Sequence, residues 1–93
     1  MPDLMKINRT LKDDKLIDVR TAEEFAQGHL AGASNIPLDM IKIADVEPGS
    51  KIYCHSGHRA EAAKHILNRR GIESENIGGI IDYTGEIETG PEK

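Results

Sequence analysis

The chain has 93 residues, a length that supports one small domain with a single hydrophobic core. Aromatic residues make up 3% of the chain and tryptophan is absent, so the core must consist largely of aliphatic side chains. The net charge of -4 argues against a nucleic-acid-binding protein, which normally carries a basic surface.

The first half of the chain predicts a strand followed by a helix. Residues 5–7 are compatible with an edge strand, and residues 16–19 form an apolar run containing a carboxylate, as in a buried strand. Thr21 and Glu24 have the spacing of a capping box, which favours a helix starting after Thr21. Gly28 is expected to end that helix, because glycine enters the left-handed region without a Cβ clash.

The middle of the chain predicts two more strands with short connections. Residues 34–37 are typical of a short strand ended by proline, and residues 38–43 of a short helix. A turn is expected at residues 47–50, because they contain adjacent Pro and Gly. Residues 51–54 then form a third strand, which ends at the cysteine.

The second half repeats the alternation of strand and helix. Apolar residues recur at helical spacing after the third strand, and Gly71 is expected to end this second long helix. Residues 77–80 predict a last strand, and the acidic tail, residues 84–93, is expected to be frayed. Strands alternating with helices indicate a single α/β domain, residues 1–93, with parallel strands and helices on both faces.

The sole cysteine, Cys54, lies where ligands commonly bind, at the carboxyl end of a strand just before a helix. The loop of His55, Ser56, Gly57, His58 and Arg59 can direct its backbone amides toward one centre, since Gly57 permits the tight curvature. The helix N-terminus and the Arg59 guanidinium add positive charge. This setting favours a thiolate, so we expect Cys54 to be a nucleophile rather than an inert buried thiol.

The spacing from the cysteine to the arginine distinguishes two kinds of anion. Phosphatases and arsenate reductases that use cysteine enclose a tetrahedral oxyanion with C-x5-R, a spacing that would place the arginine at Ala60. Here the arginine comes one residue earlier, at Arg59. The shorter loop favours a sulfur atom carried on Cys54 over a phosphate, and a phosphatase or arsenate reductase is the less favoured alternative.

Three ordered blocks, "LIDVRTAEEFAQGHLAGASNIP", "IYCHSGHRA" and "NIGGI", resemble single-domain rhodaneses of the phage-shock-protein-E type, which are thiosulfate sulfurtransferases. The resemblance implies a small rhodanese-like three-layer α/β/α domain with a mainly parallel sheet, trimmed at both termini. It also implies that Cys54 accepts a sulfane sulfur from thiosulfate or a persulfide and passes it to cyanide or a thiol. Residues 55–59 would bind the persulfide, and Arg59 would attract the anionic donor. No metal or cofactor is implied.

Other polar residues are interpreted mainly as structural. Asp18 and Arg20 are expected to tie their strand to neighbouring elements and support the cysteine loop indirectly. His29 is expected to donate to a backbone carbonyl. Cys54, His55 and His58 do not have a zinc-ligand spacing, although His58 could titrate beside the site.

The lone cysteine and the hydropathy pattern bear on location and partners. One cysteine cannot form an intramolecular disulfide, and no basic segment precedes an apolar one at the N-terminus. We expect a soluble cytoplasmic protein, or a periplasmic one if a signal peptide has been removed, with neither nucleic acid nor membrane as partner. The alternative to a free-standing enzyme is a sulfur-delivery or redox-sensing module that acts on a protein partner.

Overall fold

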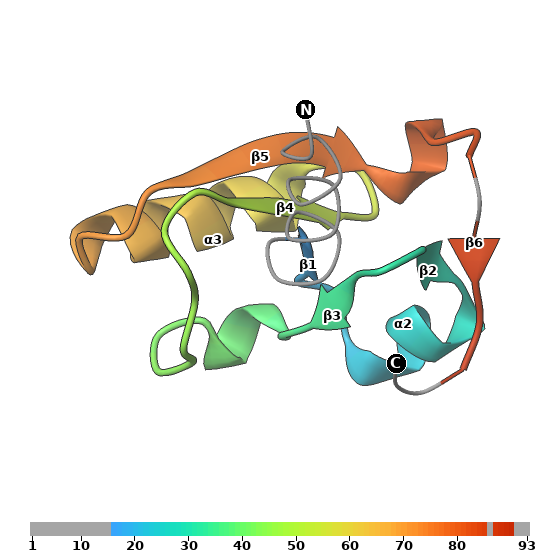
Figure 1. Ribbon diagram of the computed structural model, residues 1–93, viewed down its shortest axis with the longest axis horizontal. Coiled ribbons are helices and arrows are strands. Elements are labelled where there is room, and N and C mark those ends of the chain that lie inside the picture. The colour runs from blue at the N-terminus through green and yellow to red at the C-terminus, as the bar shows by residue number, and fades with distance from the viewer. Residues whose placement is uncertain (1–15, 86, 91–93) are drawn as a thin grey trace, which may run out of the picture.

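A four-stranded parallel sheet is the centre of the fold in the computed structural model, which describes residues 16–85 and 87–90 (Figure 1). The strands lie in the order β3-β1-β4-β5. Their bounds are Leu16–Asp18 for β1, Ser34–Asn35 for β3, Ser50–Cys54 for β4 and Ser74–Gly79 for β5. The parallel sheet predicted from the sequence is confirmed, whereas the edge strand predicted at residues 5–7 lies outside the described residues.

The two faces of the sheet carry separate hydrophobic clusters, because successive side chains of a strand point to opposite sides. Ile52 and Cys54 of β4 belong to one cluster, with Leu67 of helix α3 (His58–Arg69). Tyr53, between them, belongs to the other cluster, with Phe25 of helix α2 (Ala22–Gln27). The prediction of helices on both faces is therefore confirmed.

The capping box at the start of α2 is present as predicted. The backbone amide of Glu24 donates to Thr21 Oγ1 at 3.1 Å, and the amide of Thr21 donates to Glu24 Oε1 at 3.0 Å. The helix ends before Gly28, whose amide donates to the carbonyl of Phe25. The helix thus ends where predicted, but Gly28, with φ 158° and ψ 129°, does not adopt the left-handed helical conformation expected of it.

Two predicted elements differ from those observed. The helix expected at residues 38–43 is a single 3-10 turn, η1 (Leu38–Met40); Ile41 is fully buried but Ile43 is 73% exposed, so no continuous apolar face supports a longer helix. β5 begins at Ser74, earlier than predicted, because its polar first half pairs with β4. The chain then continues into a second 3-10 turn, η2 (Ile80–Asp82).

A second, two-stranded sheet joins distant parts of the chain. β2 (His29–Leu30) pairs antiparallel with β6 (Ile87–Glu88), and the amide of Gly90 donates to the carbonyl of Ala26 at 2.9 Å. The described part of the tail that we expected to be frayed thus includes a paired strand. Ile87 and Glu88 are too short a run to give a strand signal, and their pairing depends on a partner more than fifty residues earlier.

Candidate active site

Cys54 is the last residue of β4 and lies beneath the loop that leads into α3. Cys54 is only 1% exposed, and its side chain packs in the same cluster as Val19 and Ala60. The preceding strand is central in the sheet, with β1 on one side and β5 on the other. A central strand fixes the backbone of Cys54, so only the χ1 rotation remains to move its sulfur.

Two backbone amides point at the sulfur of Cys54. The amide of Gly57 donates to Sγ at 2.9 Å, and the amide of Ala60, in the first turn of α3, donates at 3.3 Å. Gly57 has a φ of 105°, a left-handed conformation that glycine adopts without steric cost. Amide donors and a helix N-terminus favour a negatively charged sulfur, so the geometry suits a thiolate.

Among the described contacts, no side chain of the loop residues 55–59 hydrogen-bonds to the sulfur of Cys54. His55, Ser56 and His58 are exposed, and Ser56 Oγ lies 3.2 Å from His58 Nδ1. The carbonyl of His55 accepts from the amide of Ile81 at 3.1 Å. The exposed side chains of His55, Ser56 and His58 form the rim of the loop.

β5 packs closely against the loop at Gly79. A Cβ added there would lie 2.5 Å from the Cα of Ser56 and closer still to the carbonyl of His55, although Gly79 has an ordinary extended conformation. Cys54 pairs with Gly79 across a register shift in the sheet. The requirement for glycine at this position is therefore steric, and it gives a physical reason for the second glycine of "NIGGI".

Arg59 is paired with a carboxylate. Its guanidinium donates to both oxygens of Glu24, at 2.7 and 3.0 Å, linking α3 to α2. This ion pair raises the pKa of Arg59 and, with the amide of Thr21, lowers the pKa of Glu24 to about 2. The sequence predicted the capping role of Glu24 but not this contact, because the two residues lie 35 positions apart.

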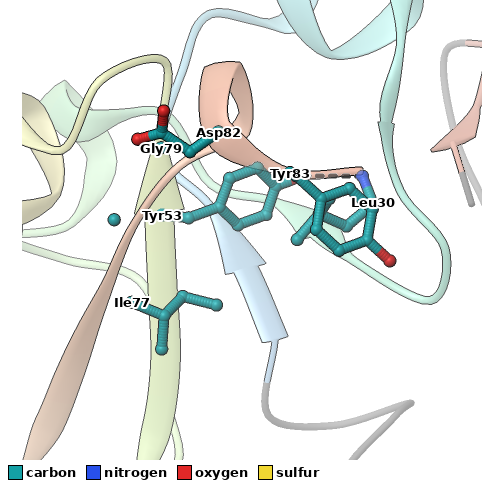
Figure 2. A pocket seen from close by; sticks show the side chains of 7 residues that line it. Leu30, Tyr53, Ile77, Gly79, Asp82 and Tyr83 are labelled. Atoms are coloured by element: carbon teal, nitrogen blue, oxygen red, sulfur yellow. Dashed lines mark hydrogen bonds between the residues drawn. The ribbon is translucent and has the colours of Figure 1, made fainter. Parts of the chain in front are cut away.

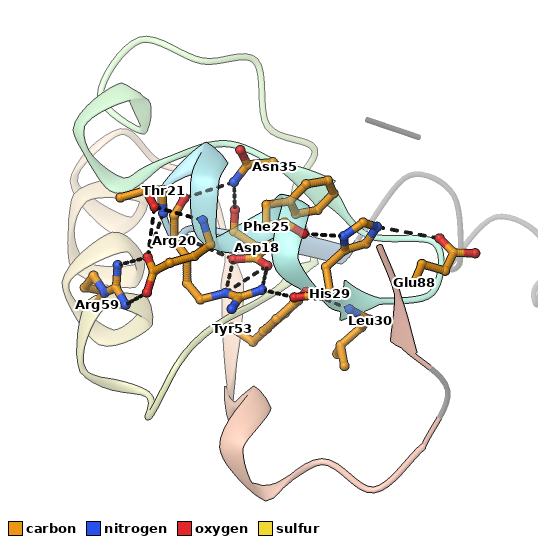
Figure 3. A network of polar contacts seen from close by, with 12 residues as sticks. Asp18, Arg20, Thr21, Phe25, His29, Leu30, Asn35, Tyr53, Arg59 and Glu88 are labelled. Atoms are coloured by element: carbon orange, nitrogen blue, oxygen red, sulfur yellow. Dashed lines mark hydrogen bonds and ion pairs between the residues drawn. The ribbon is translucent and has the colours of Figure 1, made fainter. Parts of the chain in front are cut away.

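Asp18 and Arg20 form a buried ion pair at the end of β1, as Figure 3 shows. Arg20 Nη2 donates to Asp18 Oδ2 at 2.6 Å and to the carbonyl of Gly28 at 2.6 Å, which ties β1 to the end of α2. Burial by itself would lower the pKa of Arg20, but Asp18 raises it overall. The pair joins neighbouring elements, as the sequence predicted, and its polar atoms face the α2 side of the sheet.

His29 and Tyr53 extend this buried network (Figure 3). His29 Nδ1 lies 2.7 Å from the carbonyl of Phe25, and the imidazole stacks on the Phe25 ring at 3.6 Å between centroids. The amide of Leu30 donates to the Tyr53 hydroxyl at 3.0 Å, and burial raises the pKa of that phenol. The predicted contact of His29 with a backbone carbonyl is present.

Two hollows flank the sheet on opposite faces. An open groove of about 450 Å³, mostly apolar, is lined by Val19, Arg59 and Lys42 among others. A smaller one, of about 170 Å³, is lined by Leu30, Tyr53 and Tyr83 among others (Figure 2). Since Val19 and Cys54 share one cluster and Tyr53 belongs to the other, the larger groove lies on the face of Cys54 and the smaller one on the opposite face.

The residues described by the structure contain no cluster of three or more histidine, cysteine or acidic side chains that could bind a metal ion. Within residues 16–85 and 87–90, no helix has the length and apolar character needed to cross a membrane.

Comparison with known proteins places this geometry in a family. The model of the rhodanese-like domain matches residues 3–85. Thiosulfate sulfurtransferase PspE of Escherichia coli (strain K12) is 40% identical over 73 residues, covering 71% of this chain and 70% of that protein. The putative sulfur carrier protein YrkF of Bacillus subtilis (strain 168) is 32% identical over 79 residues, covering 78% of this chain but only 43% of that protein.

A solved structure described as rhodanese with anions from E. coli superimposes with a TM-score of 0.72 and 36% identity, covering 83% of this chain and 99% of that one. The relatives support sulfur transfer as the general class of activity. The chain therefore belongs to the rhodanese-like domain family, and the fold predicted for it from the sequence is confirmed.

Proposed function

We propose that the protein is a sulfurtransferase that carries a sulfane sulfur on Cys54, with thiosulfate or a persulfide as donor. The observation that carries the proposal is the pair of backbone amides, from Gly57 and Ala60, that donate to Cys54 Sγ. They can stabilise a thiolate without a separate general base. The amides of residues 55–59 would then bind the transferred sulfur.

The reaction has two displacement steps on sulfur. In the first, the Cys54 thiolate attacks the outer sulfur of thiosulfate, the sulfur–sulfur bond of thiosulfate breaks, and sulfite leaves with the electron pair. In the second, cyanide or a thiolate attacks the outer sulfur of the Cys54 persulfide. The Cys54 thiolate leaves, and the product is thiocyanate or a new persulfide. No net oxidant or reductant is consumed.

The groove on the Cys54 face supports a route for an anionic donor. Arg59 and Lys42 both line it, and Arg59 directly precedes Ala60, whose amide donates to Cys54 Sγ. The lining also includes one carboxylate, Asp39, and Glu24 binds the Arg59 guanidinium from outside it. In this proposal the donor approaches Cys54 by way of the groove, attracted by Arg59, while its own charge weakens the hold of Glu24 on that side chain.

The proposal predicts that Cys54→Ser abolishes thiocyanate formation from thiosulfate and cyanide, because serine provides no thiolate. Intact-mass analysis of the wild-type protein after thiosulfate treatment should show one added sulfur, removable by a reductant. Because Cys54 is the sole cysteine, any such adduct belongs to it. A folded wild-type protein that forms no reducible adduct with either thiosulfate or an organic persulfide would refute the proposal.

A protein acceptor is the second candidate, favoured by the similarity to a putative sulfur carrier protein. The exposed rim of His55, Ser56 and His58 is accessible to a large partner as well as to a small molecule. Incubation of the loaded protein with cyanide, with glutathione and with cell extract would distinguish the candidates. Slow release to both small acceptors, with rapid transfer to one protein, would favour a sulfur-delivery module.

For the location of the protein we propose the cytoplasm, because a reducing compartment suits the free thiol of Cys54.

A further inference from the structure

The side chain of Asn76, on β5, bridges the cysteine loop to the rest of the fold. Its Nδ2 lies 3.2 Å from the carbonyl of Gly57 and 2.9 Å from Glu61 Oε1, to both of which it donates. Its Oδ1 accepts from the amide of Gly78 at 2.9 Å. One half-buried amide group therefore holds the start of α3 and the irregular end of β5 together.

Gly57 is the residue whose orientation this bridge controls. Its amide makes the shorter of the two described contacts to Cys54 Sγ, at 2.9 Å, whereas its carbonyl accepts from Asn76 Nδ2 and from the amide of Glu61. Glycine has no side chain to restrict its own torsions, and it retains more conformational freedom than other residues. Its N–H and its carbonyl belong to successive peptide planes joined at Cα, so holding the carbonyl removes one of the movements by which the N–H could turn away from the sulfur.

The other supports of the loop come from the main chain. The backbone amide of Ile81 donates to the carbonyl of His55, and Gly79 packs against the backbone of Ser56. Those contacts act on the first half of the loop, and the amide of Glu61 also holds the Gly57 carbonyl; all three contacts remain if side chains are exchanged. Asn76 acts on the second half, where the amide donor to the sulfur lies, and its action depends on its side chain.

We infer that Asn76 is a positioning residue, which directs the Gly57 amide at Cys54 Sγ and thereby sets the reactivity of the thiolate. The role requires a group that donates on one side and accepts on the other, which an asparagine amide does. Leucine has nearly the same shape but neither function, and aspartate would bring a carboxylate against the Gly57 carbonyl and Glu61. The inference rests on the proposed function only in taking Cys54 Sγ as the reacting atom.

The test is the pH profile of Cys54 alkylation by iodoacetamide, which reports the thiolate of the only cysteine in the chain. In Asn76→Leu, which adds no charge, we expect the midpoint of the profile to move to higher pH, because the Gly57 amide is no longer held toward the sulfur. In the sulfurtransferase assay, kcat should fall by about tenfold at a pH below the midpoint, with KM for thiosulfate little changed.

Asn35→Leu is the matched control, because Asn35 also bridges two backbone carbonyls, those of Asp18 and Arg20, on the far side of the sheet from β5. It should lower the melting temperature yet leave the alkylation midpoint unchanged. Asn76→Ser, a milder change, gives the same readout if Asn76→Leu does not fold. An unchanged midpoint in folded Asn76 variants, or an equal shift in Asn35→Leu, would overturn the inference. A shifted midpoint in a protein that transfers no sulfur would leave it standing and refute the proposed function instead.

Discussion

At the scale of single residues, Arg59 is the side chain whose role depends most on its surroundings. The sequence suggested that its guanidinium attracts the anionic donor, and the structure shows both of its described contacts going to Glu24. An ion pair that is about one-third exposed contributes modestly, because water screens the charges. A donor anion at the groove can therefore compete with Glu24 for the same guanidinium.

This competition gives a prediction for two variants. Arg59→Ala should raise KM for thiosulfate about fivefold, the equivalent of about 1 kcal/mol, with a smaller effect on kcat, since the attraction acts before sulfur transfer. Glu24→Gln should lower KM, because a neutral amide holds the guanidinium less strongly. Steady-state kinetics measure both, and Arg69→Ala, at the far end of α3, is the control. If KM is the same in Arg59→Ala as in the wild type, Arg59 serves only to link the two helices.

At the scale of elements, β5 packs against the cysteine loop so closely that the backbones of the two segments are in contact. Gly79 approaches the backbone of His55 and Ser56 so tightly that no side chain fits, although its own torsions suit any residue. The neighbouring Gly78 has a φ of 107°, a conformation that does favour glycine. Two adjacent glycines thus meet two different requirements, one steric and one conformational.

Gly79→Ala should displace the loop and abolish most sulfur transfer, because a Cβ there overlaps backbone atoms that cannot move independently of Cys54. Gly71→Ala is the matched control: its φ of 81° makes alanine strained, but a Cβ would meet nothing within 4 Å. Both variants should lose stability, by about 1 kcal/mol from strain in the case of Gly71→Ala. Thermal melts and turnover compare them, and a fully active Gly79→Ala would show that the loop tolerates displacement.

At the scale of the whole molecule, α2 and α3 cover opposite faces of the sheet, and Glu24 and Arg59 join them beyond the carboxyl ends of the two inner strands, β1 and β4. Hydrogen bonds from Arg59 and from the Thr21 amide lower the pKa of Glu24 from its ordinary value of 4.5 to about 2. A carboxylate whose pKa is lower in the folded than in the unfolded protein stabilises the fold above the unfolded pKa. That stabilisation is lost as the pH falls from about 4.5 through about 2.

The difference in unfolding free energy between the wild type and Glu24→Gln should therefore shrink as the pH is lowered through this range. Urea unfolding at several pH values between 7 and 2 measures it. Glu23→Gln is the control, because it makes the same chemical change at the adjacent, exposed position. A difference for Glu24→Gln that stays constant across the range would contradict the assignment of the lowered pKa to this pair.

The sequence by itself determined the features that depend on nearest neighbours in the chain. The capping box of Thr21 and Glu24, the end of α2 at Gly28 and the strand–loop–helix around Cys54 follow from residues a few positions apart, and all are present. Only the tertiary structure decided the partners of Arg59, the clearance at Gly79, the bridge of Asn76 and the pairing of β6 with β2. The physical reason is separation along the chain: local hydrogen bonds and torsional preferences follow from short patterns, whereas contacts between distant segments form only when the sheet brings them together.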